Sequence, residues 1–298
     1  MLENNPLVSV IIRTYNNRNS LLKEAVESVL SQTYDNLEIV IVEDGSEYAK
    51  KILNLVKSRT TCNIVYETMP KSGRCIIGNK GMQVANGEYL IFLDDDDKFY
   101  ESHIEDLITA LQKNNVLVAY SNAYEVETEF LSTEPLKYVE RKKSVIYNQE
   151  FSRALLWRQN YMSIQSVLFS KKLFLECGGF DSELDALEDW HLWVKFSLKT
   201  DFYHLDKVTS MYRVPYKKNV SNDRLLSMEQ YKQKVFDKQK ELLVTLTVKE
   251  FNSMVDELDK KTKVISVSKD DVRNFILKYS CLNFIYWKAR AIYYSFLK

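Results

Sequence analysis

Residues 89–97 read YLIFLDDDD, a run of apolar residues that ends in four aspartates, and this stretch indicates the fold. A short, uninterrupted apolar run is typical of a strand that is buried on both faces of a sheet. Similar runs stand at residues 8–12 (VSVII) and 37–42 (LEIVIV), and stretches with helical apolar spacing follow at 21–30 and 104–111. Strands that alternate with helices predict an α/β fold with a mostly parallel sheet.

Polar residues stand where three of these strands end. Thr14 and Tyr15 follow the first strand, Asp44 ends the second, and the aspartates from Asp94 to Asp97 end the stretch quoted above. In sheets of this kind, ligands bind outside the carboxyl ends of the strands. We therefore expect these side chains to gather at one edge of the sheet and to form a functional site there.

The composition excludes several classes of protein. The chain has 298 residues, with 41 Lys and Arg against 41 Asp and Glu, so no nucleic-acid partner is expected. The four cysteines form no C-x-x-C pair, which favours reduced thiols over disulfides or a zinc site. No signal peptide and no apolar stretch of about 18–20 residues is present, so we expect a cytoplasmic protein.

The four consecutive aspartates repel one another, and a bound cation would relieve that repulsion. Carboxylate oxygens suit Mn²⁺ or Mg²⁺, and the alternative interpretation is a solvated acidic loop. A calcium-binding EF-hand is excluded, because Phe99 occupies the position that requires glycine. The glycine-rich phosphate loops of P-loop NTPases and dinucleotide enzymes are absent as well, so a bound phosphate would need the metal.

Several segments together resemble a known family. They read VSVIIRTYNN (8–17), SVLSQTYDNLEIVIVEDGS (28–46), ANGEYLIFLDDDD (85–97), GGFD (178–181) and EDWHLW (188–193). In this order and spacing they are similar to the inverting glycosyltransferases of family 2, over about residues 6–215. The resemblance implies a GT-A fold, a nucleotide-sugar donor and a saccharide acceptor.

The resemblance also implies roles for the residues at matching positions. Thr14 and Tyr15 would line the nucleobase pocket, and Asp44 would hydrogen-bond the base or the ribose. Asp94 and Asp96 would form the D-x-D pair, with Asp94 near the ribose and Asp96 on the metal that bridges the donor diphosphate. The residues assigned to the nucleotide are Thr14, Tyr15, Asp44, Arg74, Asp94 and Asp95.

The EDW motif at residues 188–190 carries the catalytic prediction. By resemblance, Asp189 is the catalytic base, Glu188 is the second candidate, and Trp190 forms part of the acceptor floor. An attacking sugar hydroxyl needs a carboxylate within hydrogen-bonding reach, and a single inverting displacement needs only one. The alternative interpretation is an acidic helix N-terminus that the helix dipole stabilises.

The chain departs from the family at one position. The family usually has Ala-Arg-Asn ahead of the fourth strand, and its arginine helps to neutralise phosphate. Gly78 stands where that arginine is expected. We hypothesise that Arg74 or Lys80 supplies the charge instead.

Residues 121–146 have the pattern of irregular or hairpin structure, and residues 202–214 that of two short strands. The pattern changes near residue 217, beyond which the chain is helical and highly charged. We predict a transferase domain over residues 1–217, with a nucleotide-sugar half at about 1–120 and an acceptor half at about 121–217. Residues 218–298 form a predicted helical C-terminal extension.

The last segment, residues 273–298, is rich in aromatic and basic residues and has the apolar spacing of an amphipathic helix. Such a helix can pack on its own domain, form a homodimer or lie in a bilayer interface, where anionic lipids attract its cations. The sequence leaves these alternatives open. Peripheral contact with the cytoplasmic face of the inner membrane would suit an acceptor that is linked to a lipid.

These features predict a metal-dependent, inverting glycosyltransferase of the hexosyltransferase type, with a UDP-sugar as donor and Mn²⁺ or Mg²⁺ as cofactor. On family grounds, the setting is the synthesis of a bacterial surface polysaccharide such as O-antigen or capsule. Two alternatives are a non-catalytic nucleotide-sugar or glycan-binding module on the same fold, and a sugar nucleotidyltransferase. A nucleotidyltransferase needs a glycine-rich basic loop after the first strand, and residues 13–16 (RTYN) do not form one.

Overall fold

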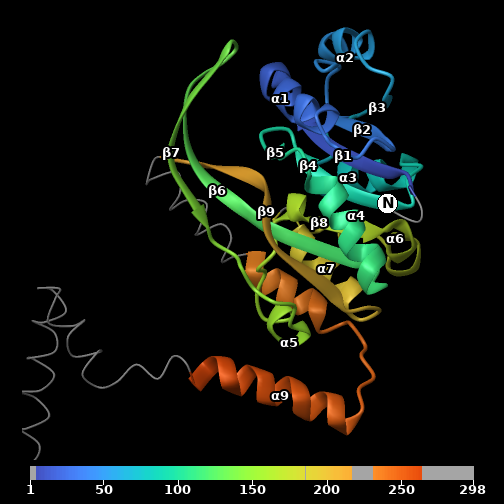
Figure 1. Ribbon diagram of the computed structural model, residues 1–298, viewed down its shortest axis with the longest axis vertical. Helices are drawn as coiled ribbons and strands as arrows, with labels where there is room; N and C mark the ends of the chain where they lie inside the picture. The colour runs from blue at the N-terminus through green and yellow to red at the C-terminus, as the bar shows by residue number, and fades with distance from the viewer. Residues whose placement is uncertain (1–4, 185, 217–230, 264–298) are drawn as a thin grey trace, which may run out of the picture. The chain divides into compact units, whose positions relative to one another are not determined.

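The computed structural model describes residues 5–184, 186–216 and 231–263 (Figure 1). Contacts within the chain divide it into two units, Met1–Thr245 and Leu246–Lys298. The first unit contains every residue with a predicted site role, and the second contributes one described helix, α9 (Val248–Lys263). Within the described ranges, no helix is both long and apolar enough to cross a bilayer. The predicted tail helix at 273–298 lies outside them.

A mixed sheet forms the centre of the first unit. Its strands follow the order β3-β2-β1-β4-β8-β6-β9-β5, and β7 pairs with β6 beside this path. The strands are β1 (Val8–Tyr15), β2 (Leu37–Asp44), β3 (Asn63–Met69), β4 (Tyr89–Asp94), β5 (Lys98–Phe99), β6 (Val118–Thr133), β7 (Leu136–Val145), β8 (Val167–Ser170) and β9 (Phe202–Pro215). The strands β1 to β4 pair in parallel, and β8 runs antiparallel to both β4 and β6.

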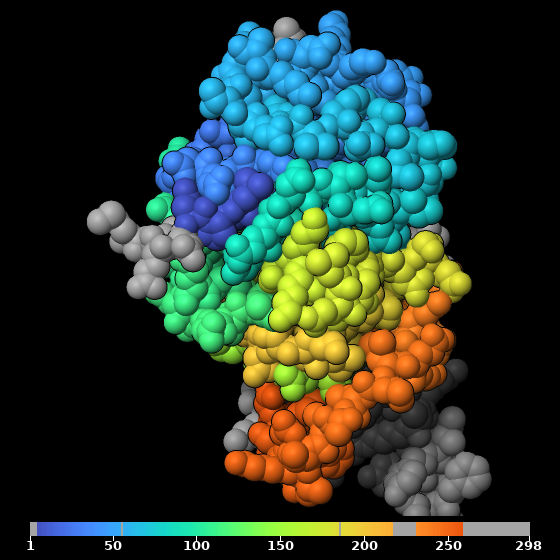
Figure 2. Space-filling view, turned by 90° about the vertical axis from the view of Figure 1, so that its right-hand side faces the viewer, coloured from blue at the N-terminus to red at the C-terminus, as the bar shows by residue number. Residues whose placement is uncertain are grey.

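Helices flank this sheet, which confirms the predicted α/β class. The helices of the first unit are α1 (Asn19–Leu30), α2 (Lys50–Lys57), α3 (Arg74–Val84), α4 (His103–Asn114), α5 (Arg153–Leu156), the 3-10 helix η1 (Ile164–Ser166), α6 (Lys171–Cys177), α7 (Glu188–Ser197) and a helical segment at residues 231–239. Figure 2 shows α3 beside the residues that follow α6, where Asn79 exchanges two hydrogen bonds with the Phe180 backbone.

The central strands are apolar at successive positions because both of their faces are buried. Side chains alternate between the two faces of a strand. In β1, Val10 and Ile12 belong to the core that includes α1, α2 and α4, whereas Ile11 belongs to the core that includes α3, α6 and α7. In β4, Ile91 and Phe92 divide between these two cores in the same way. A strand in this position has no polar face to alternate with an apolar one.

Residues 121–146, predicted as irregular or hairpin structure, form a long hairpin of β6 and β7 (Figure 1). Its tip returns to the first turn of α1. There Glu134 accepts hydrogen bonds from the Ser20 amide at 2.8 Å and from the Ser20 hydroxyl at 2.6 Å. The hairpin thus supplies a cap to a helix end that its own sequence leaves uncapped.

One prediction about the later strands was wrong. We expected two short strands between residues 202 and 214, but β9 is a single strand of 14 residues. Its pairing with β6 shifts register on both sides of Asn122, which leaves Asp206 and Lys207 outside the ladder. This irregularity lets the strand continue past two polar residues that interrupt the apolar pattern.

The first unit also ends later than residue 217. The ring of Phe236, in the helical segment 231–239, meets the ring of Trp190 with centroids 5.3 Å apart. Lys238 Nζ lies 3.2 Å from Asp181 Oδ2. These residues therefore pack with the first unit, which extends to Thr245. A charged helix with one apolar face has the same sequence pattern whether it packs on the preceding domain or begins a new one.

Candidate active site

The carboxyl ends of β1, β2 and β4 meet at one edge of the sheet, as expected. Strand β1 lies between the other two, and its register pairs Arg13 with Asp94 of β4 and Tyr15 with Asp44 of β2. The N-terminus of α7 joins this edge through an ion pair between Arg13 and Glu188. Residues from four elements are thus brought together at this edge.

Arg13 is the centre of this arrangement. Its Nε and Nη2 donate to Asp94 Oδ1 at 3.0 and 2.7 Å, and its Nη1 donates to Glu188 Oε1 at 2.8 Å. Burial alone would lower the pKa of Arg13, but the two carboxylates raise it. Burial would also raise the pKa of Asp94, and the charges of Arg13 and Arg74 outweigh that effect and lower it. Both partners are therefore held in their charged forms.

The four aspartates divide into two open and two buried side chains. Asp94 and Asp96 are 25% and 32% exposed, whereas Asp95 is 3% exposed and Asp97 is buried. Burial, together with the charge of Asp96, raises the pKa of Asp95 to about 7. Burial raises the pKa of Asp97 as well, although its Oδ1 accepts the Arg213 amide at 2.9 Å. The open pair is Asp94 and Asp96, and the other two support the turn.

A second arginine, Arg18, approaches the open Asp96 and the buried Asp95 from the loop after β1. Its Nη2 lies 2.8 Å from Asp96 Oδ2 and 3.1 Å from Asp95 Oδ1. Its guanidinium stands 4.9 Å from the centre of the exposed Tyr15 ring and donates to the Tyr15 hydroxyl at 2.9 Å. The aromatic side chain predicted to contact the nucleobase is therefore open and held beside the acidic turn.

Two residues predicted to contact the nucleotide are already bonded within the protein. The Thr14 side chain is buried, and its hydroxyl donates to Asp95 Oδ2 at 2.6 Å. Asp44 accepts the backbone amides of Ser72 at 2.5 Å and Gly73 at 3.1 Å. Thr14 thus holds the acidic turn instead of lining an open pocket with its side chain, and Asp44 fixes the loop that leads into α3.

The acidic pair at the start of α7 divides its two carboxylates between different partners. Glu188 is buried against Arg13, whereas Asp189 is half-buried and accepts from Asn160 Nδ2 at 3.0 Å and from the Trp190 amide at 2.8 Å. Burial first, and the charge of Glu188 second, raise the pKa of Asp189 to about 7. A carboxylate with a pKa near neutrality suits proton transfer at physiological pH.

Trp190 does not lie where we expected it. Its side chain is 1% exposed, and its indole nitrogen donates to the Leu156 carbonyl oxygen at 2.5 Å. A tryptophan with an apolar body and a satisfied N–H is a core residue. It therefore supports the wall behind Asp189 and offers no open face to an acceptor.

The two candidates for the missing arginine at residue 78 lie in different places. Arg74, at the start of α3, is 49% exposed, and its Nη1 lies 3.7 Å from Glu188 Oε1. Lys80 instead lies 3.6 Å from Glu67 on β3. Arg74 is thus the candidate that reaches the acidic site. A side chain at Gly78 has no room, because a Cβ there would lie 2.6 Å from Phe180 Cε2.

The open aspartates fit the predicted divalent metal. Among the described residues, no group of three or more His, Cys, Asp and Glu side chains is placed to hold an ion by itself. Mg²⁺ at phosphate-transfer sites takes one or two protein carboxylates and fills its other positions with substrate phosphates and water. Asp96, with Asp94 beside it, offers this kind of donor set. The metal would then be held jointly with a donor diphosphate.

The sequence patterns did not identify three residues of this site, namely Arg13, Arg18 and Asn160. Arg13 had a signal, since it directly follows the apolar run at residues 8–12, as Asp94 follows the apolar run of β4 81 residues later. Arg18 and Asn160 stand in loops with no pattern of their own. Only their positions in the folded chain connect them to the site.

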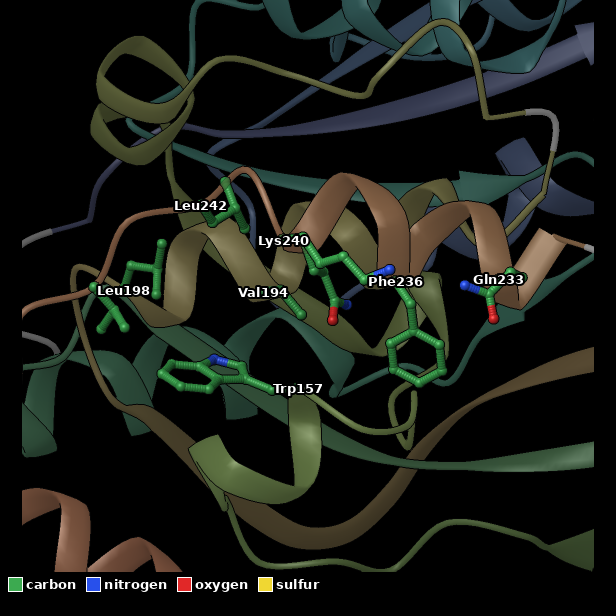
Figure 3. Close-up of a pocket in the computed structure, with 9 residues that line it drawn as sticks. Trp157, Val194, Leu198, Gln233, Phe236, Lys240 and Leu242 are labelled. Atoms are coloured by element: carbon green, nitrogen blue, oxygen red, sulfur yellow. The ribbon is translucent and has the colours of Figure 1, made fainter.

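A separate cavity of about 540 Å³ lies between α5, α7 and the helical segment 231–239 (Figure 3). Its lining includes Trp157, Val194, Leu198, Phe236 and Leu242. None of the described residues that line it is an aspartate or a glutamate.

The chain is similar to several known glycosyltransferases. An uncharacterized glycosyltransferase of Rickettsia typhi is 30% identical over 239 residues, which span 76% of this chain and 69% of that protein. WcaA, a putative colanic acid biosynthesis glycosyl transferase of Escherichia coli K12, is 31% identical and covers 65% and 67% of the two chains. WfaP of Escherichia coli, a UDP-Glc:α-D-GlcNAc-diphosphoundecaprenol β-1,3-glucosyltransferase, is 36% identical over 43% of this chain and 49% of its own.

Solved glycosyltransferase structures share the fold. TarS of Staphylococcus aureus (residues 1–349, in complex with UDP) has a TM-score of 0.59 and 19% identity, and covers 94% of this chain and 77% of its own. The mannosyltransferase PcManGT of Pyrobaculum calidifontis, in complex with GDP-Man and Mn²⁺, has a TM-score of 0.63 and 18% identity, with 82% and 67% covered. These likenesses confirm the GT-A fold. The family model described as glycosyl transferase family 2 matches residues 9–178, more than half of the chain, and the protein belongs to this family.

Proposed function

We propose that the protein is a metal-dependent, inverting hexosyltransferase that takes a UDP-sugar and extends a lipid-linked saccharide in bacterial surface polysaccharide synthesis. One observation carries the proposal. Asp94 ends β4, Asp96 lies in the turn that follows, and Arg13 links Asp94 to Glu188, the neighbour of Asp189, whose carboxyl has a raised pKa. This arrangement offers a donor-phosphate side and a proton-accepting side in one site.

Asp189 is the proposed catalytic base. It takes the proton of the acceptor hydroxyl as that oxygen forms a bond to the anomeric carbon of the donor sugar. The bond from the anomeric carbon to the diphosphate oxygen breaks at the same time, and the nucleoside diphosphate leaves with the electron pair. A single displacement of this kind inverts the anomeric configuration and needs one carboxylate. Glu188 is the weaker candidate, because its carboxylate is buried against Arg13.

The proposed donor side consists of Asp94, Asp96 and Tyr15. Asp94 lies near the ribose, Asp96 holds the metal, and the exposed Tyr15 ring packs on the nucleobase. When bound, Mn²⁺ or Mg²⁺ supplies positive charge that stabilises the departing diphosphate. Arg18 is paired with Asp96 and stacked on Tyr15. Its guanidinium therefore has to move when the metal and the nucleobase bind at these two residues.

The choice of a UDP-sugar and a lipid-linked acceptor draws on the relatives. The name of WfaP states UDP-Glc as donor and a diphosphoundecaprenol-linked sugar as acceptor, and TarS has been crystallised with UDP and with UDP-GlcNAc. PcManGT, which shares the fold, holds GDP-Man, so the fold binds more than one nucleotide. WcaA supports a polysaccharide pathway. Peripheral membrane contact through residues 273–298 belongs to the same proposal, and those residues lie outside the described structure.

A panel of nucleotide sugars tests the proposal directly. Hydrolysis or transfer is measured with UDP- and GDP-sugars, in Mn²⁺ or Mg²⁺ and again in EDTA, for the natural protein and for Asp189→Asn. The proposal expects turnover with a UDP-sugar that EDTA abolishes and that Asp189→Asn lowers by about 10²-fold or more. Nucleotide binding without turnover of any donor would instead favour the non-catalytic binding module.

A further inference from the structure

The proposed reaction gives no role to Arg13, a buried cation at the centre of the site. Arg13 lies on β1 at 5% exposure. Its three polar contacts go to Asp94 on β4 and Glu188 on α7. These two carboxylates belong to the two halves of the site and come from distant parts of the sequence.

The geometry of Arg13 suits a residue that links two carboxylates. Two nitrogens bind one oxygen of Asp94 while the third binds Glu188, so the planar fork fixes both partners at once. The guanidinium stands 5.5 Å from the Phe92 ring centre and 5.7 Å from the Phe180 ring centre. These aromatic rings restrict where the guanidinium can move. A lysine ammonium, as a single point charge, cannot reproduce this double contact.

Gly78 shows how the chain makes room for this bridge. A Cβ at residue 78 would lie 2.6 Å from Phe180 Cε2 and 3.5 Å from Arg13 Cδ. Helix α3 therefore passes too close to Phe180 and Arg13 to carry a side chain at this position. A side chain at residue 78 has no space here, while the Arg13 side chain from β1 fills the adjoining volume.

We propose that Arg13 is the positioning residue that holds the donor carboxylate Asp94 and the acceptor-side Glu188 in one network. This inference rests on the proposed transferase function. Without Arg13, the two carboxylates would face each other with only the more distant charges of Arg74, 3.7 Å from Glu188, and Arg18 nearby. They would repel each other and move apart, which would displace both Asp94 and the start of α7, where Asp189 lies.

The test combines four variants: Arg13→Met, Arg13→Lys, Glu188→Gln and the double variant Arg13→Met/Glu188→Gln. Transfer kinetics give kcat and KM for the donor, and calorimetry gives the affinity for UDP, which needs no turnover. Arg153→Met is the matched control, because Arg153 pairs with Asp201 outside the site. Circular dichroism establishes that each variant is folded.

The network predicts losses in both halves of the site. Arg13→Met is expected to lower kcat by about 10²-fold, the scale of a misplacement of about 1 Å, and to weaken UDP binding by about tenfold. Arg13→Lys should recover part of each loss. In the Glu188→Gln background the same Arg13→Met change should cost several-fold less than in the natural protein, because contacting residues are not additive, and the remaining cost reports the lost contacts with Asp94. Arg153→Met should match the natural protein.

Several outcomes would overturn the inference. One is that Arg13→Met keeps kcat and UDP affinity within threefold of the natural protein. Another is that the loss in the double variant equals the product of the losses in the two single variants, which would mean that the two residues act independently. If Arg13→Met fails to fold, a folded double variant supports the network, since the unpaired buried charge has been removed, and an unfolded double variant refutes it. If the natural protein transfers no sugar at all, the proposed function fails, while the UDP affinities still test Arg13.

Discussion

The pH dependence of sugar transfer should report the ionisation of Asp189. Burial, and then the negative charge of Glu188, raise the pKa of this carboxyl to about 7. A general base works in its ionised form, so kcat/KM should fall about tenfold per pH unit well below pH 7 and level off above it. Below its pKa, most Asp189 carboxyl groups are protonated and cannot accept the proton of the acceptor hydroxyl.

Two substitutions should move this profile in opposite directions. Glu188→Gln removes the neighbouring negative charge, so the pKa of Asp189 falls and the acidic limb moves to lower pH. Asn160→Ala removes a hydrogen bond to the ionised carboxylate, so the pKa rises and the limb moves to higher pH. A hydrogen bond to a charged group contributes about 1.5–3 kcal/mol, and one pKa unit corresponds to about 1.4 kcal/mol. Shifts of about one unit or more are therefore expected for Asn160→Ala.

The assay measures kcat/KM between pH 5 and 9 at constant ionic strength, through release of the nucleoside diphosphate. The position of the limb is compared among the three proteins, so a uniform loss of activity does not affect the result. If kcat/KM of the natural protein stays constant down to pH 5, the assignment of Asp189 as the general base is refuted. Movement of both variants in the same direction would refute the electrostatic account of its pKa.

Four further changes have distinct expected outcomes. Gly78→Ala should lower the free energy of unfolding by about 1–3 kcal/mol in denaturant titrations, because its Cβ meets Phe180, and an unchanged midpoint would contradict this packing. Trp190→Ala should cost about 3–5 kcal/mol as a core cavity, whereas a change in acceptor KM with full stability would restore the acceptor-floor prediction. Asp96→Asn should weaken Mn²⁺ binding in the presence of UDP by about tenfold or more in calorimetry, while UDP affinity in EDTA stays the same. Deletion of residues 273–298 should reduce sedimentation with anionic liposomes, and equal sedimentation of both proteins would argue against membrane contact.

Local sequence patterns were sufficient to predict the central strands of the sheet and the edge at which the site lies. The runs that form β1, β2 and β4 are apolar because they are buried on both faces, and this requirement is visible residue by residue. The polar residues that end them meet at one edge because parallel strands share a direction. The patterns did not predict that β9 is one continuous strand, because a shift in register interrupts its apolar pattern. They also did not predict that the segment 231–239 packs its apolar face within the first unit.

The roles of single side chains depended on which of them face the solvent. The resemblance to family 2 enzymes pointed to Asp94 and Asp96, and these are the two aspartates with open carboxylates. It also pointed to Thr14 and Trp190, whose side chains are buried and bonded to other parts of the protein. The exposure of a side chain depends on how the whole domain packs, so a short motif does not predict it.

Sequence patterns alone predict an α/β sheet with an acidic edge, and the motifs of this chain resemble those of sugar transferases. These conclusions depend on neighbouring residues, since strand burial, helical spacing and strand ends are local properties. Packing of the folded chain decided that Arg13 bridges Asp94 and Glu188, across 81 and 175 residues of chain. It also decided that Gly78 leaves space for that bridge. Contacts over such separations arise when distant segments pack together, and no local pattern specifies them.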